Sequence, residues 1–266
     1  MVSVGAQARF EAAQALVLRA GEALRAGRLD AVGVRRKTDH QDLVTVFDQS
    51  TEQLLRRGIL EAFPQDAVVG EEYPASGAPG RQGAVWYLDP IDGTTNFVNQ
   101  RRGYAVSAAC WQGGAPLFGI VLDVAARELY TAQAGGGAWC NGRPLHTSPR
   151  SEVCSALLYT PGVLHTFLKP HPWREGLCRL ASEVRAVRSL GSVALELCAV
   201  AAGRAELFAA TRSSPWDHNA ARVILAEAGG CICRMDGAPL AETDSTAVLA
   251  ACSPGLLAAM RARLGA

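Results

Sequence analysis

The order of apolar and polar positions along the chain predicts a mixture of helices and strands. Apolar residues recur at the spacing of one helical face between Phe10 and Leu24, and Gly27 follows as a stop signal. Thr45 and Asp48 have the spacing of a capping box, with Asp in place of Glu, and predict the start of a second helix. Helices are therefore expected over residues 6–25 and from about 45 onward, and strands over 67–70 and 84–88.

The middle of the chain is typical of an antiparallel sheet. Apolar runs of strand length follow one another at 104–111, 117–124 and 128–132, and turn signals occur at Gly135–Gly137 and Asn141-Gly142. The remaining expected elements are strands at 154–159, 204–209, 231–233 and 246–251, and helices at 173–184, 192–202, 216–228 and the C-terminus. This mixture predicts an α+β protein of stacked layers rather than a simple Rossmann sheet.

Length, charge and cysteine usage narrow the class of protein. The 266 residues lie near the roughly 250–300 that one hydrophobic core supports. One domain over 1–266 is expected, with halves of about 1–145 and 146–266. A net charge of +1 gives no field that favours nucleic acid or an anionic membrane. No apolar run reaches the ~18 residues of a membrane span, and the N-terminus lacks the pattern of a secretion signal. Eight cysteines, mostly in apolar stretches, suit reduced thiols in a cytoplasmic protein.

The strongest indication of chemistry is a pair of acids at the end of one predicted strand. Asp89 ends the apolar run, Pro90 holds a turn, and Asp92 follows three residues after Asp89. Gly93 permits close backbone approach, and Thr94 can open a helix. Two carboxylates beside free N–H groups suit cations that bridge to a phosphate. Taken alone, an Asp-Gly pair also fits an ordinary turn.

Further acids occupy similar positions elsewhere. Glu71-Glu72 ends another predicted strand, Asp217 opens a predicted helix after Trp216, and Asp48 lies in the first turn of a third element. A single acid at a helix start is usually a cap. Several acids that converge would repel one another, and hard divalent cations would relieve that repulsion.

These acids fall within four blocks that resemble the inositol monophosphatase family, part of the larger group that includes fructose-1,6-bisphosphatase. The blocks are Asp42-Leu-Val-Thr-Val-Phe-Asp48, Val69-Gly-Glu-Glu72, Asp89-Pro-Ile-Asp-Gly-Thr-Thr-Asn-Phe97, and Trp216-Asp217 followed by Glu227-Ala-Gly-Gly230. They occur in order, and the resemblance extends from Lys37 to Gly237. It implies a layered αβαβα sandwich, a magnesium-dependent and lithium-sensitive hydrolase, and commonly a homodimer.

The resemblance also implies a metal set of two to three Mg²⁺ ions per active site. Glu71 and Asp89 would hold the first ion, together with the backbone carbonyl of Ile91. Asp89 would bridge to a second ion, which Asp92 and Asp217 also hold. A weaker third ion would lie near Glu71.

Catalysis in the family would need no protein nucleophile. Thr94 and Asp48, with Glu71, would position and deprotonate the attacking water, and the N–H groups of Gly93 and Thr94, beside Asp92, would hold the phosphate. Attack would be in line, without a phosphoenzyme. The accessory candidates near the site are Lys37, Glu72, Thr95 and Arg212.

Two departures from the family pattern bear on the substrate. Ala210 stands where inositol phosphatases usually have a Glu that contacts inositol hydroxyls, and Val193 stands where they usually have Ala. Arg212 is a candidate replacement contact. Inositol monophosphate is the expected substrate. Histidinol phosphate, fructose 1,6-bisphosphate and other sugar phosphates stay open, whereas Thr95-Asn96 in place of Lys-Glu argues against an adenosine bisphosphate.

Other classes of protein fit the sequence less well. A phosphate-ester-binding protein without catalysis is disfavoured by the complete set of acids. Cys198 and Arg204 have the spacing of cysteine phosphatases, but Cys198 lies in a helical apolar run and is expected in the core. His218 is expected on a helix surface, and Arg101-Arg102 as solvated charges that alternatively steer an anionic ester.

Overall fold

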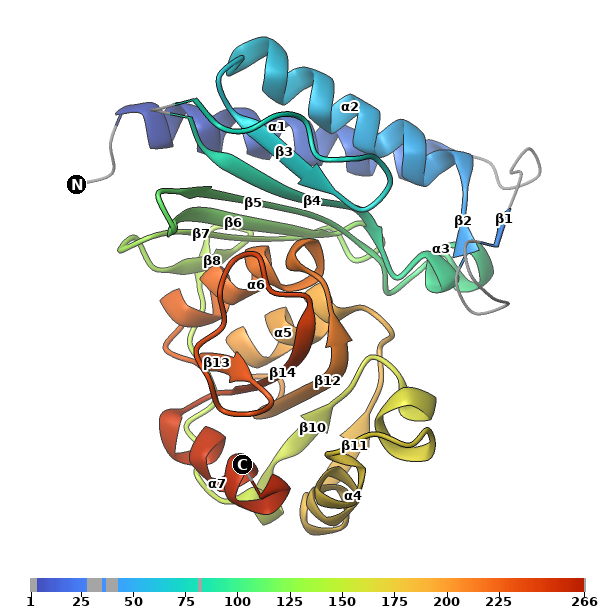
Figure 1. The fold of residues 1–266 in the computed structure, drawn as a ribbon, viewed down its shortest axis with the longest axis vertical. Helices are drawn as coiled ribbons and strands as arrows, with labels where there is room; N and C mark the ends of the chain where they lie inside the picture. The colour runs from blue at the N-terminus through green and yellow to red at the C-terminus, as the bar shows by residue number, and fades with distance from the viewer. Residues whose placement is uncertain (1–3, 28–34, 37–42, 81–82, 266) are drawn as a thin grey trace.

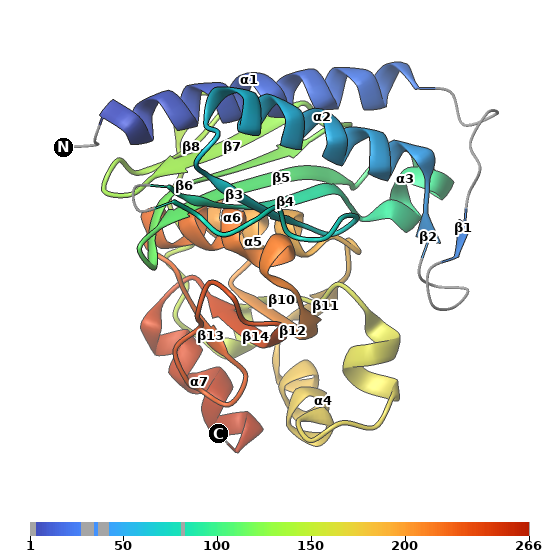
Figure 2. The same cartoon turned by 45° about the horizontal axis from the view of Figure 1, so that its top comes forward.

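Two helices at the N-terminus cover one face of the larger sheet. The computed structural model of the chain describes residues 4–27, 35–36, 43–80 and 83–265. Helices α1 (Val4–Ala26) and α2 (Val46–Ala62) lie side by side above this sheet (Figures 1 and 2). The predicted capping box begins α2: Thr45 N donates to Asp48 Oδ2 at 2.7 Å, and Phe47 N donates to Thr45 Oγ1 at 3.1 Å. Between β1 (Arg35–Arg36) and β2 (Leu43–Val44) there is an antiparallel pairing.

The larger sheet has seven strands in the order β3-β4-β5-β6-β7-β8-β9. Their bounds are β3 Ala67–Gly70, β4 Val85–Asp92, β5 Ala105–Gln112, β6 Ala115–Asp123, β7 Glu128–Gln133, β8 Ala138–Cys140 and β9 Arg143–Pro144. Strand β3 pairs with β4 in parallel, and the later neighbours are antiparallel, as the strand-and-turn pattern predicted. A short helix, α3 (Thr94–Gln100), leaves the end of β4.

Two buried helices lie between the larger sheet and the smaller one. They are α5 (Val193–Ala201) and α6 (Pro215–Glu227), and every residue of α5 is buried, because this helix is apolar on nearly all sides. At Gly119 of β6, an added Cβ would lie 2.1 Å from the carbonyl oxygen of Ala220 in α6. Only glycine therefore permits the close approach of helix and sheet at this position.

The smaller sheet and two outer helices complete the fold. Its strand order is β11-β10-β12-β14-β13, with bounds Ala186–Arg188, Leu157–Tyr159, Leu207–Ser213, Thr246–Ala251 and Cys231–Arg234. Helices α4 (Arg174–Glu183) and α7 (Pro254–Leu264) lie on its outer side (Figure 1). A 3-10 turn η2 (Val153–Ser155) precedes β10, and a π-helical turn η3 (Leu164–Leu168) follows it. The result is the expected αβαβα succession of layers.

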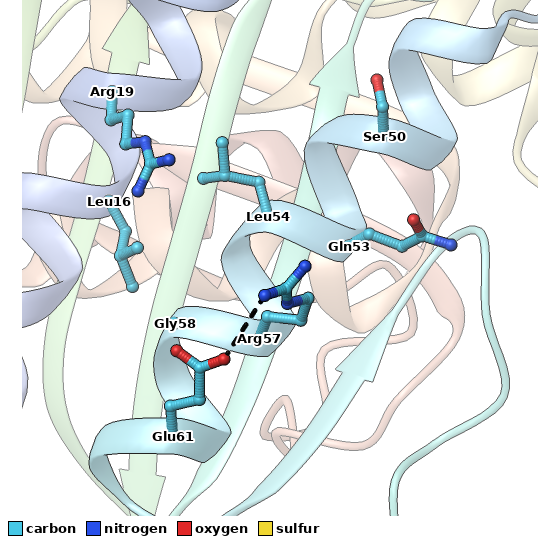
Figure 3. Close-up of a pocket in the computed structure, with 8 residues that line it drawn as sticks. All are labelled: Leu16, Arg19, Ser50, Gln53, Leu54, Arg57, Gly58 and Glu61. Atoms are coloured by element: carbon cyan, nitrogen blue, oxygen red, sulfur yellow. Dashed lines mark ion pairs between the residues drawn. The ribbon is translucent and has the colours of Figure 1, made fainter.

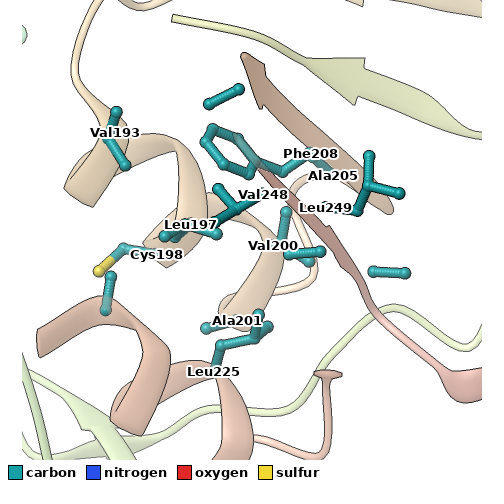
Figure 4. Close-up of a cluster of buried hydrophobic side chains, with 14 of the residues drawn as sticks. Val193, Leu197, Cys198, Val200, Ala201, Ala205, Phe208, Leu225, Val248 and Leu249 are labelled. Carbon is teal, nitrogen blue, oxygen red and sulfur yellow. The ribbon is translucent and has the colours of Figure 1, made fainter. Parts of the chain in front are cut away.

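The larger core cluster fills the space between α5, α6 and the sheets. Phe208, Val248 and Leu249 from β12 and β14 meet Leu197 and Val200 from α5 (Figure 4). Cys198 lies in this core, where burial raises the pKa of its thiol, so the expected structural role is confirmed. A second cluster lies between α1, α2 and the larger sheet, around Trp86 and Phe118. Among the described residues, no helix combines the length and apolarity that crossing a membrane requires.

Candidate active site

The site begins where β4 leaves the regular sheet. Pairing between β4 and β5 runs as far as Asp89 opposite Ser107, is interrupted, and resumes at Asp92 opposite Ala105. Pro90 within the interruption has no N–H to give to the ladder. The Ile91 N–H donates to Asp89 Oδ1 at 3.0 Å. Asp89 and Asp92 are buried, so the irregular strand end places two carboxylates in the interior.

Asp48 caps a helix and serves the site at the same time. Its Oδ2 accepts from Thr45 N and from Thr45 Oγ1, each at 2.7 Å. Its Oδ1 accepts from the Thr94 hydroxyl at 3.0 Å, and the Ile91 carbonyl oxygen lies equally close to that hydroxyl. The cap fixes the carboxylate through Oδ2, and Oδ1 accepts from Thr94, which lies 46 positions later in the sequence. Asp48 can therefore cap α2 and take part in the chemistry of the site at the same time.

Asp217 has the same arrangement in α6. It is the N3 residue of a capping box, in which Ser214 N donates to Asp217 Oδ2 at 2.7 Å. Pro215 occupies the first turn, where its missing N–H removes nothing from the helix. Two of the predicted site acids thus stand at equivalent positions of two helices, where the positive end of the helix dipole favours a carboxylate.

Three chain segments meet around Gly93. Gly93 has φ 92°, and an added Cβ would lie 3.0 Å from the Gly103 carbonyl oxygen and 3.3 Å from that of Gly191. The Asn96 amide donates to the carbonyls of Gly103 and Leu190 at 2.7 and 2.6 Å. Glycine is required here because the backbone is left-handed and crowded on two sides. The segment that follows Asp92 is thereby fixed against the loop before α5.

That loop also holds Asp92 directly. Ser192 Oγ donates to Asp92 Oδ2 at 2.7 Å, and Ala194 N donates to the same oxygen at 2.6 Å. Burial raises the pKa of Asp92 to about 6, and these hydrogen bonds oppose the shift because they favour the charged form. The sequence blocks contained Asp92 but did not reveal these partners about 100 residues away.

The predicted acids act on one another electrostatically. Burial raises the pKa of Asp89 well above its ordinary value, and the negative charges of Glu71, Asp92, Asp217 and Asp48 raise it further. The structure therefore brings Glu71, Asp92, Asp217 and Asp48 close enough to act electrostatically on Asp89.

The chemistry of this donor set fits a hard divalent cation. Carboxylate and carbonyl oxygens are the ligands that Mg²⁺ takes, and positive charge would offset the repulsion around Asp89. The side chains are not closed around an ion as they stand: among the described residues, no group of three or more His, Cys, Asp or Glu is arranged to hold a metal.

A cavity of about 320 Å³ adjoins Asp217. Asp217 and Val193 line it, with Arg212, Thr211 and His165 on other sides. The remaining lining residues are Pro161, Gly162, Thr166, Ser213 and Ser214. An alcohol bound there would lie beside Asp217, which supports the expected positions of Val193 and Arg212 near a substrate.

The expectation for Ala210 is corrected by the structure. Ala210 is 1% exposed, belongs to the buried core and does not line the cavity. The expectation rested on a match to a family Glu position, which does not carry the direction of this side chain. Pairing between β12 and β14 becomes irregular after Ala210 and resumes at Ser213. Thr211 occupies the cavity wall instead.

The accessory candidates have different surroundings. Glu71 and Glu72 directly follow β3 and are partly buried, and Glu72 N donates to Glu52 at 2.7 Å. Thr95 is exposed, one residue beyond Thr94. Lys37 lies outside the described residues, as does Asp42 of the first sequence block.

Two expectations about charged residues near the site are wrong. His218 is fully buried rather than on a helix surface, with Nδ1 2.8 Å from Ser213 Oγ, and burial lowers its pKa to about 4. Arg101 is not simply solvated: its guanidinium donates to the carbonyls of Leu24 and Gly27 and lies 4.5 Å from the centroid of the Phe97 ring. The apolar stem of an arginine side chain can be buried while its charged end makes polar contacts, which permits such partly buried positions.

Glu196 supports the loop that holds Asp92 and was missed by sequence reasoning. It is fully buried in α5, and its Oε1 accepts from Leu190 N at 2.6 Å and Gly191 N at 3.2 Å. Burial raises the pKa of Glu196 to about 8, against these two hydrogen bonds. Glu196 lies four residues after Ser192, which caps the helix. Acids are common in the first turn of a helix because they interact favourably with the helix dipole, so the sequence does not distinguish a supporting role.

This raised pKa predicts a pH dependence of stability. From the ordinary value of 4.5 up to about 8, the folded protein keeps a proton that the unfolded chain has lost. The free energy of unfolding therefore falls as pH rises through this window, by up to about 1.4 kcal/mol per pH unit. Glu196→Gln keeps the Oε1 acceptor and should remove this slope. Urea unfolding of both metal-free proteins at pH 6, 7 and 8 measures the difference, and parallel curves would contradict it.

Comparisons with known proteins agree with this geometry. The model of the inositol monophosphatase family matches residues 6–264. The inositol-1-monophosphatase of Bacillus subtilis (strain 168) is 35% identical over 240 residues, covering 90% of this chain and 90% of that protein. A crystal structure of inositol monophosphate bound SaIMPase-II superimposes with a TM-score of 0.83 at 30% identity, covering 96% of this chain and 92% of that one. The extragenic suppressor protein suhB from Bartonella henselae gives a TM-score of 0.87 at 27% identity, over 96% and 97% of the two chains. The chain belongs to the inositol monophosphatase family.

Proposed function

We propose that the chain hydrolyses inositol monophosphate with the help of Mg²⁺, and that Glu71, Asp89, Ile91, Asp92 and Asp217 hold the ions. Family membership makes it a phosphoric monoester hydrolase. The observation that carries the proposal is the electrostatic effect of four acids on the buried Asp89, beside a hydroxyl that is hydrogen-bonded to Asp48. Donors of this kind suit two to three Mg²⁺ ions.

The residues divide the work of hydrolysis between them. Bound ions would supply activation of the attacking water and neutralise charge on the leaving oxygen. Thr94 donates its hydroxyl proton to Asp48 Oδ1, so the lone pairs of Thr94 Oγ1 remain available to orient a water. Asp48 is the base that takes the proton of this water. The N–H groups of Gly93 and Thr94 hold phosphate oxygens. The alcohol part of the ester occupies the cavity beside Asp217, lined by Val193 and Arg212.

Several further properties are proposed from the family resemblance. They are inhibition by lithium, a homodimer and a single domain over 1–266. The eight free cysteines support a cytoplasmic location, because such thiols persist in reducing compartments. Histidinol phosphate and fructose 1,6-bisphosphate are disfavoured, since the named relative and the ligand-bound neighbour both concern inositol monophosphate.

The experiment that tests this function compares esters at saturating Mg²⁺. We expect the highest kcat/KM for inositol 1-phosphate when it is compared with histidinol phosphate, fructose 1,6-bisphosphate and adenosine 3',5'-bisphosphate. Chelation of Mg²⁺ should abolish phosphate release. Release of no phosphate from any ester would refute the catalytic proposal, and a preference for another ester would refute the substrate.

Arg212 provides a prediction about substrate binding. Its exposed side chain lines the cavity but is not among the acids that hold the ions. Arg212→Ala should raise KM for inositol 1-phosphate about fivefold, the loss of roughly one hydrogen bond, with kcat within about twofold. Arg185→Ala, at an exposed arginine that does not line the cavity, is the matched control. Equal KM values for the two variants would remove Arg212 from the binding site.

A further inference from the structure

The buried face of α2 carries a second acid one turn beyond Asp48. Glu52 is fully buried, and its Oε2 accepts from the Glu72 N–H at 2.7 Å. Positions 48 and 52 are four apart and therefore lie on the same side of the helix. One helix face thus reaches both the Asp48–Thr94 pair and the turn that carries Glu71.

Arg56 links Glu52 to Tyr73, the second residue after Glu71. Its Nε lies 2.6 Å from Glu52 Oε1, and its Nη2 donates to the Tyr73 carbonyl at 3.0 Å. The guanidinium lies 5.9 Å from the centroid of the Tyr73 ring. Gln53 Nε2 donates to the Tyr73 hydroxyl at 2.8 Å. The backbone after Glu71 is therefore held at two successive residues by side chains of α2.

Gly70 shows how closely Glu52 packs on the same turn. An added Cβ at Gly70 would lie 2.4 Å from Glu52 Oε1 and 2.6 Å from its carboxyl carbon. The carboxylate therefore lies against the backbone before Glu71 as well as bonding the backbone after it. The Glu52 side chain has no exposed surface. Glu52 therefore contacts the backbone on both sides of Glu71.

We propose that Glu52 and Arg56 are positioning residues, which hold Glu71 at the distance from Asp89 that ion binding requires. The inference rests on the proposed function. Neither residue is among those proposed to hold the ions or the ester. A buried ion pair contributes little to stability in general, because the loss of hydration offsets its attraction, so its effect should appear in ion affinity more than in folding.

The test measures Mg²⁺ binding to metal-free protein by isothermal titration calorimetry, with MgCl₂ as the only ligand. Glu52→Gln, which keeps the size of the side chain but loses its charge, should raise the Kd for Mg²⁺ about tenfold. The double variant Glu52→Gln/Arg56→Met removes both charges and should recover the melting temperature lost by the single variant. Its Kd should stay about tenfold above the wild type, since neither the charge of Glu52 beside the Glu72 N–H nor the Arg56 hydrogen bond to the Tyr73 carbonyl is restored.

The same helix offers a matched control pair. Arg57 and Glu61 also form an i,i+4 ion pair, 3.6 Å apart, but their side chains are 81% and 71% exposed (Figure 3). Glu61→Gln and Arg57→Met/Glu61→Gln should leave the Kd for Mg²⁺ unchanged. An unchanged Kd in Glu52→Gln, or recovery of the wild-type Kd in the buried double variant, would overturn the positioning role.

The two proposals can fail separately. If wild-type protein binds Mg²⁺ and Glu52→Gln binds it less tightly, but no ester is hydrolysed, the hydrolase proposal fails and the positioning role stands. If esters are hydrolysed and Glu52→Gln keeps the wild-type Kd, the positioning role fails alone. Wild-type protein that binds no Mg²⁺ would refute the positioning role, whatever its activity.

Discussion

Asp92→Asn is expected to lower kcat for inositol 1-phosphate at least about 1,000-fold without loss of fold. A factor of 1,000 corresponds to about 4 kcal/mol of transition-state stabilisation. The substitution removes one negative charge from the group around Asp89 while keeping the size of the side chain. The asparagine oxygen can still accept from Ser192 Oγ and Ala194 N, which now donate to Asp92 Oδ2. The variant should therefore keep the contact that fixes the loop before α5.

Urea unfolding distinguishes a loss of activity in Asp92→Asn from a loss of the fold. Burial holds the pKa of Asp92 at about 6, so its ionised form carries a desolvation cost at neutral pH when no ion is bound. Metal-free Asp92→Asn should unfold at a urea concentration equal to or above that of the wild type. Asp236→Asn, at a surface carboxylate, is the control and should leave kcat unchanged. Wild-type kcat in Asp92→Asn would mean that the carboxylate takes no part in catalysis.

Thr94→Val should lower kcat about 100-fold to 1,000-fold, with KM changed much less. Valine replaces the hydroxyl that bonds Asp48 Oδ1 at 3.0 Å with a methyl group of similar size, and general acid–base groups typically contribute factors of this order. Asp48 would keep its two hydrogen bonds to Thr45, so the start of α2 should persist. Initial rates of phosphate release over a range of ester concentrations separate kcat from KM.

Two variants at neighbouring positions sharpen this test. Thr94→Ser restores the hydroxyl and should recover kcat to within about tenfold of the wild type. Thr95→Val makes the same chemical change one residue further along, on an exposed side chain, and should leave kcat unchanged. A Thr94→Val enzyme as active as Thr95→Val would exclude the Thr94–Asp48 pair from water activation.

Features that depend on residues close together in the sequence were predicted correctly. Strands β3 and β14 have the predicted bounds, and the capping box at Thr45 is present because its two residues are three positions apart. The order of the four blocks identified the family and, with it, the acids that the fold gathers around Asp89. The antiparallel middle strands followed from short runs separated by turns.

Long-range packing limited the rest of the prediction. The partners of Asp92 at Ser192 and Ala194 lie about 100 positions away, and nothing local to either segment specifies that contact. His218 was misplaced because α6 is buried between two sheets, so even its polar positions face the interior. Ala210 was placed beside the substrate by its match to a family Glu position, but the small side chain packs in the core of this chain. Each of these depends on how separate elements meet in space.

Crystals soaked with Mn²⁺ and inorganic phosphate, and measured for anomalous scattering, would test the central claim most directly. Mn²⁺ takes the oxygen ligands that suit Mg²⁺ and can be located by its own signal. At least two anomalous peaks are expected, both within about 2.5 Å of oxygens from Asp89 and its neighbours Glu71, Asp92 or Asp217, with phosphate against the Gly93 backbone. Peaks confined to other parts of the surface, with these four carboxylates unliganded, would contradict the account.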